Sequence, residues 1–152
     1  MNIIIATDGT RHGQRAVETL SRIKIEPKDE VRVISVVDMA VPLAIDVYGG
    51  YLPDTSELEK AARENAKRVL DAAVTAAQTI AGDDAKVTGE VLFGSPDSRI
   101  VEAAEQMKAD LIILGSHGYN RWERLLLGSV SDSVVHHAPC SVLVVRSAGD
   151  DR

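Results

Sequence analysis

The residues in this sequence with the clearest chemical potential are three glycines and two serines between positions 115 and 131. Their spacing is G-x2-G-x9-G-S, with Gly115 and Gly118 after an apolar run and Gly128 directly before Ser129. Glycine lets a backbone approach a ligand closely. A helix beginning near Ser129 presents unpaired N–H groups and the positive end of its dipole. With the hydroxyls of Ser129 and Ser131, this arrangement is suited to phosphate oxygens.

A structural role explains the same residues equally well. Glycines are common where a strand turns into a loop, so Gly115 and Gly118 suit a simple turn. Ser129 and Asp132 have the spacing of a capping box, in which the serine only caps its own helix. The residues alone therefore leave phosphate binding and helix capping as alternatives.

An acidic residue occupies a comparable place after the first apolar run. The stretch 6–10 reads ATDGT, so Asp8 follows directly where a strand is expected to end. An acid in that position, followed by glycine, suits a ribose hydroxyl or a base amine. Its structural alternative is that Asp8 caps the helix that follows.

Alternating apolar and helical segments must position these residues. The apolar runs cover 2–6, 31–37, 85–92, 110–114 and 141–146. Helical patterns begin near positions 10, 54, 95 and 129 and fill the intervals. This alternation predicts an α/β fold, an open five-stranded parallel sheet with helices on both faces. In the strand order 3-2-1-4-5 the winding reverses between strands 1 and 4, so both polar exits meet at the crevice where ligands bind.

The second helical pattern is the clearest of the four. Its apolar residues recur at helical spacing, which predicts a single face turned toward the sheet. They are Leu58, Ala62, Ala66, Val69, Ala73, Ala77 and Ile80.

The composition excludes several classes of protein. The 152 residues fit one domain, expected over 1–147 with a polar tail at 148–152. The net charge of −6 argues against nucleic-acid binding. No apolar run reaches the about 20 residues of a membrane span, and no basic leader precedes the first run. The single cysteine, Cys140, allows no intrachain disulfide, so a cytoplasmic protein is expected.

Four stretches together resemble the universal stress protein family over nearly the whole chain. They are IIIATDGT at 3–10, GSP at 94–96, ADLIILGSHG at 109–118, and LLLGSVS at 125–131 continuing to HAPCSVLVV at 137–145. The glycine spacing resembles the ATP-binding branch of that family. Ala6 stands where some relatives have proline.

The resemblance implies a binding site for ATP, or for AMP or ADP, with magnesium arriving on the phosphates. It implies that Ala6, Thr7 and Asp8 contact the adenosine end and that Val36 and Leu114 line the adenine pocket. Around the ribose and phosphates it implies Gly115, His117, Gly118, Gly128, Ser129, Val130 and Ser131. It also implies a homodimer through the last strand, 141–146.

Other functions remain as alternatives to a regulatory nucleotide-binding module. The Walker pattern is absent, so a fast phosphoryl-transfer enzyme is not expected, whereas slow ATP hydrolysis is possible. A flavin-binding module is disfavoured because aromatic residues make up only 3% of the chain. A nucleotide-free dimer acting through protein partners is the last alternative, with the apolar loop at 38–53 as its contact surface.

Overall fold

The computed structural model describes residues 1–38, 56–83, 85–116 and 127–146. Strands and helices alternate along the chain as the sequence predicts. In order, they are β1 (Asn2–Ala6), α1 (Arg11–Thr19), the 3-10 helix η1 (Leu20–Arg22), β2 (Glu30–Val37), α2 (Ser56–Ala81), β3 (Lys86–Phe93), α3 (Pro96–Met107), β4 (Leu111–Gly115), α4 (Ser129–His137) and β5 (Ser141–Val145).

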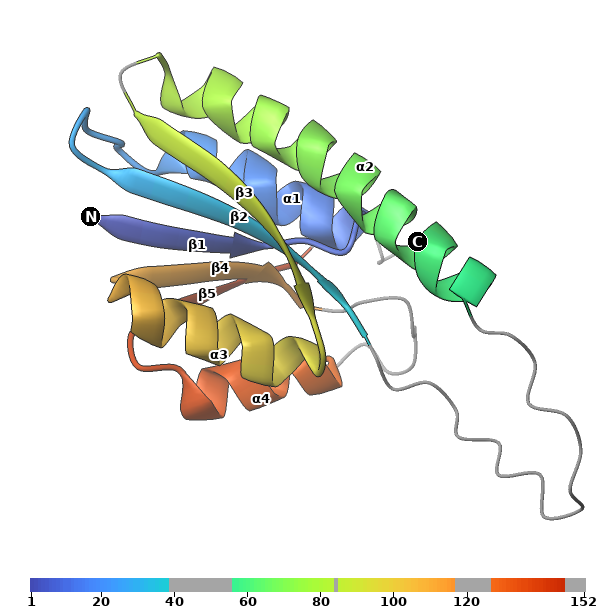
Figure 1. The fold of residues 1–152 in the computed structure, drawn as a ribbon. Helices are drawn as coiled ribbons and strands as arrows, with labels where there is room; N and C mark the ends of the chain where they lie inside the picture. Colours follow the sequence, from blue (N-terminus) through green and yellow to red (C-terminus); the bar gives the residue numbers. More distant parts are fainter. Residues whose placement is uncertain (39–55, 84, 117–126, 147–152) are drawn as a thin grey trace, which may run out of the picture.

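The five strands form one parallel sheet in the order β3-β2-β1-β4-β5, which confirms the predicted topology. Helices α1 and α2 cover one face of the sheet, and α3 and α4 cover the other (Figure 1). β1 lies at the centre, between β2 and β4. Its pairing with β2 ends at Ala6, opposite Ile34, while β2 continues to Val37. The carboxyl end of β2 therefore projects past the end of its central neighbour.

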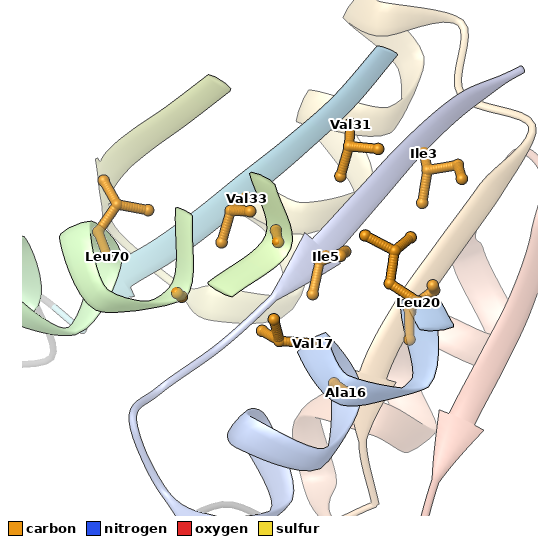
Figure 2. Packing of buried hydrophobic residues seen from close by; sticks show 11 residues of the cluster. Ile3, Ile5, Ala16, Val17, Leu20, Val31, Val33 and Leu70 are labelled. Atoms are coloured by element: carbon orange, nitrogen blue, oxygen red, sulfur yellow. The ribbon is translucent and has the colours of Figure 1, made fainter. Parts of the chain in front are cut away.

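The core consists of two aliphatic clusters, one on each face of the sheet. Successive strand residues point to opposite faces, so Ile3 and Ile5 belong to the cluster beneath α1 and α2, and Ile4 belongs to the one beneath α3 and α4. Figure 2 shows the first cluster, where Val17 and Leu20 pack against the sheet. This two-sided burial explains why the strand sequences are continuously apolar rather than alternating.

Helix α2 is longer than the strands on which it packs. Its 26 residues span about 39 Å, whereas the 8 residues of β2 span about 26 Å. The amino-terminal end of α2 consequently extends past the sheet (Figure 1). The prediction that Leu58 and Ala62 face the sheet is wrong, because both residues are exposed, Leu58 by 72%. Farther along, Ala66, Ala73 and Ala77 are buried as predicted.

Glycine marks the end of one helix, whereas another helix ends without such a residue. Gly82 follows α2 with a φ of +86°, a left-handed conformation that glycine adopts without strain. The helical pattern that begins near position 10 forms a short α-helix, because α1 ends at Thr19 and continues as η1. No helix in the described part of the chain is both long and apolar enough to cross a membrane.

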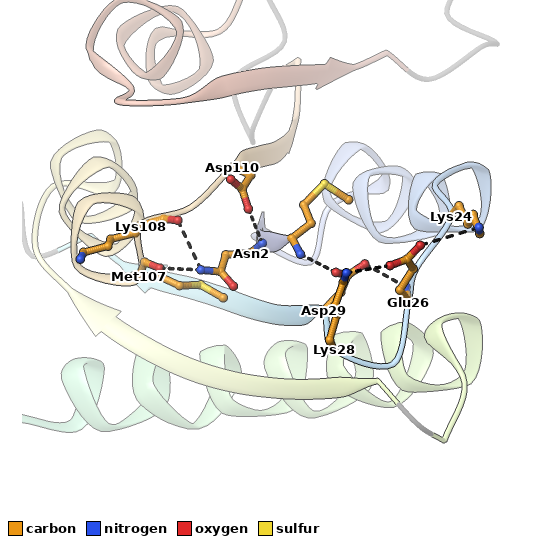
Figure 3. Close-up of polar contacts among 9 residues, drawn as sticks. Asn2, Lys24, Glu26, Lys28, Asp29, Met107, Lys108 and Asp110 are labelled. Atoms are coloured by element: carbon orange, nitrogen blue, oxygen red, sulfur yellow. Dashed lines mark hydrogen bonds and ion pairs between the residues drawn. The ribbon is translucent and has the colours of Figure 1, made fainter.

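A polar network joins segments at the amino-terminal edge of the sheet (Figure 3). The Met1 amino group pairs with the carboxylate of Asp29, which is 3% exposed. The backbone N–H of Asn2 donates to Asp110 at 2.7 Å, and its side-chain amide donates to the Met107 carbonyl at 3.0 Å. These bonds hold β1 between its neighbours at the amino-terminal ends of the strands.

Candidate functional site

A cavity of about 520 Å³ lies over the carboxyl ends of β1, β2 and β4. Its volume is within the range of small-molecule sites, and it sits where the winding of the sheet reverses. The described lining includes ten of the twelve residues expected from the sequence. They are Ala6, Thr7, Asp8, Val36, Leu114, Gly115, Gly128, Ser129, Val130 and Ser131. The remaining two, His117 and Gly118, lie outside the described residues, as do most of the 38–53 loop and the tail at 148–152.

The amino-terminal end of α4 opens onto this cavity without a side-chain cap. Gly128, not Ser129, is the N-cap residue, and no side chain caps the helix. The interpretation of Ser129 as a capping serine is therefore wrong: it is the first residue of the helix. Because the first N–H groups of a helix have no partner within it, those of α4 are available to an anion.

The hydroxyl of Ser131 has a structural role. It is 2% exposed and lies 2.9 Å from both the Ser116 carbonyl and the Gly128 carbonyl, to which it donates. A hydroxyl has one hydrogen to donate, so this one is used inside the protein. Ser131 thus holds the start of α4 against the end of β4, and its backbone rather than its hydroxyl remains for a ligand.

Asp8 orders the turn after β1 and lines the cavity at the same time. Its Oδ1 accepts from the Thr10 backbone N–H at 2.9 Å and from the Thr10 hydroxyl at 2.6 Å. Thr10 is the N-cap of α1, because its own hydroxyl accepts from the Gly13 N–H at 3.4 Å. The alternative in which Asp8 caps the helix is therefore wrong.

Gly115 is required by packing between α1 and β4. A Cβ at this position would lie 2.7 Å from the His12 Cβ and 2.8 Å from the His12 carbonyl carbon. Real side chains do not tolerate such distances, and the carbonyl carbon moves only if the helix moves. The structure thus adds a reason for this glycine beyond the close approach of a ligand.

Part of the cavity wall comes from residues that the sequence analysis did not select. α2 contributes Ala62, Asn65, Ala66 and Val69, and α3 contributes Pro96 and Ile100. Further lining comes from Gly13 of α1 and from Ile34, Ser35, Val37 and Asp38 at the end of β2. Ser35 carried a usable signal, since it is the only polar residue in the run from Val33 to Val37.

A half-buried carboxylate connects α3 to α4. Asp97, in the first turn of α3, accepts from the Ser95 hydroxyl at 2.5 Å and from the Ser133 hydroxyl of α4 at 2.7 Å. These hydrogen bonds, that of Ser95 first, lower the pKa of Asp97. Ser95, although it is the N-cap residue, uses its hydroxyl on Asp97 and not on the backbone. The contact fixes α4, and with it the open helix end, relative to α3.

The surroundings of two histidines and the cysteine in the described chain are consistent with structural roles. His136 and His137 at the end of α4 each place Nδ1 2.8 Å from a carbonyl four residues earlier. Burial raises the pKa of the Cys140 thiol, which keeps it protonated. No group of three or more potential metal-binding side chains is present among the residues that the structure describes.

Comparison with known proteins identifies relatives along almost the full chain. The model of the universal stress protein family matches residues 1–146. A universal stress protein of Staphylococcus aureus (strain USA300) is 34% identical over 147 residues, covering 96% of this chain and 84% of that protein. The structure of universal stress protein UspA from Lactobacillus plantarum superposes with a TM-score of 0.73 at 27% identity, covering 96% of this chain and 97% of that one.

A more distant structure shares the fold. It is a protein of the universal stress protein family from Arabidopsis thaliana with AMP bound, with a TM-score of 0.66, 15% identity, and coverage of 99% of this chain and 94% of that one. The family match over residues 1–146, the Staphylococcus relative and the agreement in fold lead to one conclusion. The chain belongs to the universal stress protein family.

Proposed function

We propose that the cavity binds ATP or a closely related adenine nucleotide, and that occupancy regulates what the protein contacts. The observation that carries this proposal is the uncapped amino-terminal end of α4, which opens onto the same cavity as the apolar ends of β1, β2 and β4. A site with anion-binding N–H groups at one end and apolar walls at the other is complementary to a nucleotide. A relative of the same fold contains AMP.

The nucleotide has a definite orientation in this proposal. Its phosphates accept hydrogen bonds from the backbone at the start of α4, around Ser129 and Val130, with magnesium bound to the phosphates. Its ribose lies near Asp8 and Gly115, and its base lies between Val36 and Leu114. His117 and Gly118 complete the phosphate end.

The proposed module hydrolyses ATP slowly at most. Its phosphate site consists of backbone N–H groups, which hold a phosphate without activating a water molecule. A slow ATPase is the second candidate, and a nucleotide-free dimer is the third. Single-turnover measurement of ADP release from bound ATP separates the first two, and calorimetric titration separates both from the third.

The phosphate position is tested with Ser129→Asp. A carboxylate at the start of α4 repels phosphates but leaves the base and ribose contacts in place, so ATP affinity falls at least about tenfold while adenosine affinity changes little. Ser21→Asp, at an exposed position in η1, adds the same charge remote from the cavity. Equal losses for ATP and adenosine contradict this orientation, and a wild-type protein that binds no adenine nucleotide contradicts the function itself.

We further propose that the protein forms a homodimer through β5. Among the strands that the structure describes, β5 pairs with β4 alone and forms one edge of the sheet. Leu143 in it is 37% exposed, whereas Val142 and Val144 pack against the core cluster beneath α3 and α4. Leu143→Lys is therefore the informative variant, because a charge at either valine also disturbs the core. A monomer on light scattering supports the interface, and an unchanged dimer contradicts it.

A further inference from the structure

Helix α4, whose first residues form the proposed phosphate end of the cavity, has few apolar contacts to hold it in place. It is nine residues long, and its buried residues are Ser131 and Val134. Val130 packs in part against the core cluster beneath α3 and α4, whereas Val135 is 45% exposed. A helix this short is not stable alone and takes its position from tertiary contacts. Polar contacts therefore have a large share in placing α4.

Two hydroxyls of α4 supply such contacts in different directions. The Ser131 hydroxyl is directed to the Ser116 carbonyl and holds the start of the helix to the end of β4. Ser133, two residues later, donates to the Oδ2 atom of Asp97 at 2.7 Å and holds the helix to α3. Helix α3 lies beside α4 on the same face of the sheet (Figure 1). The start of α4 is thus fixed both to the sheet and to the neighbouring helix.

The hydrogen bond of Ser133 differs from those of three threonines in other helices. Thr19, Thr75 and Thr79 each donate to the carbonyl four residues earlier, at 2.8, 2.9 and 2.9 Å, which is an ordinary use of a hydroxyl inside a helix. The Ser133 hydroxyl instead reaches a carboxylate on another helix. His137 Nδ1 lies 3.5 Å from the same hydroxyl, but it is nearer to the Ser133 carbonyl, at 2.8 Å.

The start of α3 also departs from the usual capping arrangement. Ser95 is its N-cap residue, and such a serine normally accepts a hydrogen bond from the backbone of the first turn. Here the hydroxyl caps nothing and donates to the Oδ1 atom of Asp97 at 2.5 Å. The carboxylate therefore accepts one hydroxyl from the residue that caps its own helix and one from α4. Exceptions to local rules of this kind are expected at functional sites.

Both ends of the contact between Asp97 and Ser133 lie next to residues that line the cavity. Asp97 directly follows Pro96, which belongs to the cavity wall. Ser133 lies four residues, about one helical turn, after Ser129 at the phosphate end. The bond between the two side chains therefore helps to set the position of the start of α4 relative to the α3 wall.

We infer that Asp97 and Ser133 are positioning residues, which hold the backbone N–H groups at the start of α4 in place for the phosphates of a bound nucleotide. Neither residue is among those that line the cavity, so both act through α4 and not by touching the ligand. Donors that are held in place before binding lose less freedom when a ligand arrives, which raises affinity. This inference rests on the proposed function, because it concerns the phosphate end of the same site.

The test is calorimetric titration of ATP and of adenosine into the wild type, Ser133→Ala and Ser133→Thr. When a site is correctly arranged in only a fraction of the molecules, its apparent affinity falls in proportion to that fraction. ATP affinity is expected to fall at least about threefold in Ser133→Ala, whereas adenosine affinity changes by less than about twofold, because adenosine has no phosphates. Ser133→Thr keeps the hydroxyl and is expected to restore the wild-type affinity for ATP.

Two further variants separate positioning from other effects. Thr75→Ala removes a hydroxyl that donates within α2, at an exposed position, and is expected to keep both affinities. Asp97→Ala removes the acceptor of the Ser133 bond together with a negative charge. If the carboxylate acted on the phosphates through its charge, ATP affinity would rise in this variant. Positioning predicts the opposite sign, a fall in ATP affinity.

The outcomes distinguish this inference from the proposed function. The inference is wrong, and nucleotide binding stands, if Ser133→Ala keeps its ATP affinity, if it loses ATP and adenosine affinity equally, or if Ser133→Thr restores nothing. A rise in ATP affinity in Asp97→Ala also overturns it. A wild type that binds neither ATP nor adenosine contradicts both. Urea unfolding of each variant without ligand shows that the compared proteins are folded.

Discussion

The substitution Gly115→Ala tests whether this glycine serves packing or ligand approach. The added Cβ would lie 2.7 Å from the His12 Cβ, 2.8 Å from its carbonyl carbon and 3.0 Å from its carbonyl oxygen. Two of these three atoms belong to the backbone of α1, so no rotamer change relieves the contact. The helix must move away from β4 or the strand must bend.

The cost follows from the type of contact. Overpacking a tightly packed site costs about 1–3 kcal/mol, and a contact with helix backbone belongs at the upper end, about 2–3 kcal/mol. For a chain of this length each kcal/mol lowers the melting temperature by about 2–4 °C. We therefore expect Gly115→Ala to melt about 4–12 °C below the wild type in the absence of any nucleotide.

Gly82→Ala is the matched control for this measurement. Gly82 has a φ of +86° and nothing within 4 Å of an added Cβ, so alanine there incurs only the backbone strain of about 1–2 kcal/mol. Thermal and urea unfolding of both variants, each without ligand, give the comparison. If Gly115→Ala is as stable as the wild type and loses only nucleotide affinity, the packing argument is refuted and the glycine serves ligand approach alone.

Three further predictions concern stability. Thr88→Val is expected to leave the free energy of unfolding in urea unchanged or to raise it by up to about 1 kcal/mol, because Thr88 Oγ1 is buried without a hydrogen-bond partner among the described residues; a clear loss would mean that the hydroxyl is bonded in the free protein. Ile113→Ala, at a fully buried position, is expected to lower the free energy of unfolding by about 2–5 kcal/mol; a loss below about 1 kcal/mol would contradict the tight packing of the core beneath α1 and α2. The pKa of Asp97 is lowered in the folded state, so its stabilising contribution is present above the unfolded pKa of about 3.9 and disappears as the pH falls through the folded value. Asp97→Asn is therefore expected to lose less stability than the wild type as the pH falls through this acidic range. The same pH dependence in both proteins would contradict this contribution.

The sequence predicted the sheet well because the signal for it is local. Each strand is a short β-branched run, and burial on both faces makes that run continuous. For the strand order 3-2-1-4-5, the rule that crossovers between parallel strands are right-handed then places helices on both faces. The face of α2 was less predictable, because the spacing that marks Leu58 as apolar does not indicate where the strands beneath the helix end.

The residues of the candidate site also fall into those that the sequence predicts and those that it does not. Glycines and serines at strand exits can be recognised from their type and position in the sequence. Asp8, Gly128 and Ser129 line the cavity as expected. Asn65 could not be selected, because it is one of many exposed polar residues along α2, and only the position of the helix in three dimensions brings it to the cavity. The N-cap of α4 is Gly128 and not Ser129. Spacing alone does not resolve a difference of one residue.

The alternation of isoleucines between the two core clusters gives the protein a built-in set of spectroscopic reporters. Within β1, Ile3 and Ile5 lie on one face of the sheet and Ile4 on the other, so the methyl resonances of residues adjacent in sequence report on separate layers. Ile34 and Ile100 line the cavity, and neither cluster has an aromatic member among the described residues to shift these signals. With isotope-labelled isoleucine, a ligand over the strand ends would displace the Ile34 and Ile100 signals first, and the spread of the effect through the layers would show how far occupancy is transmitted.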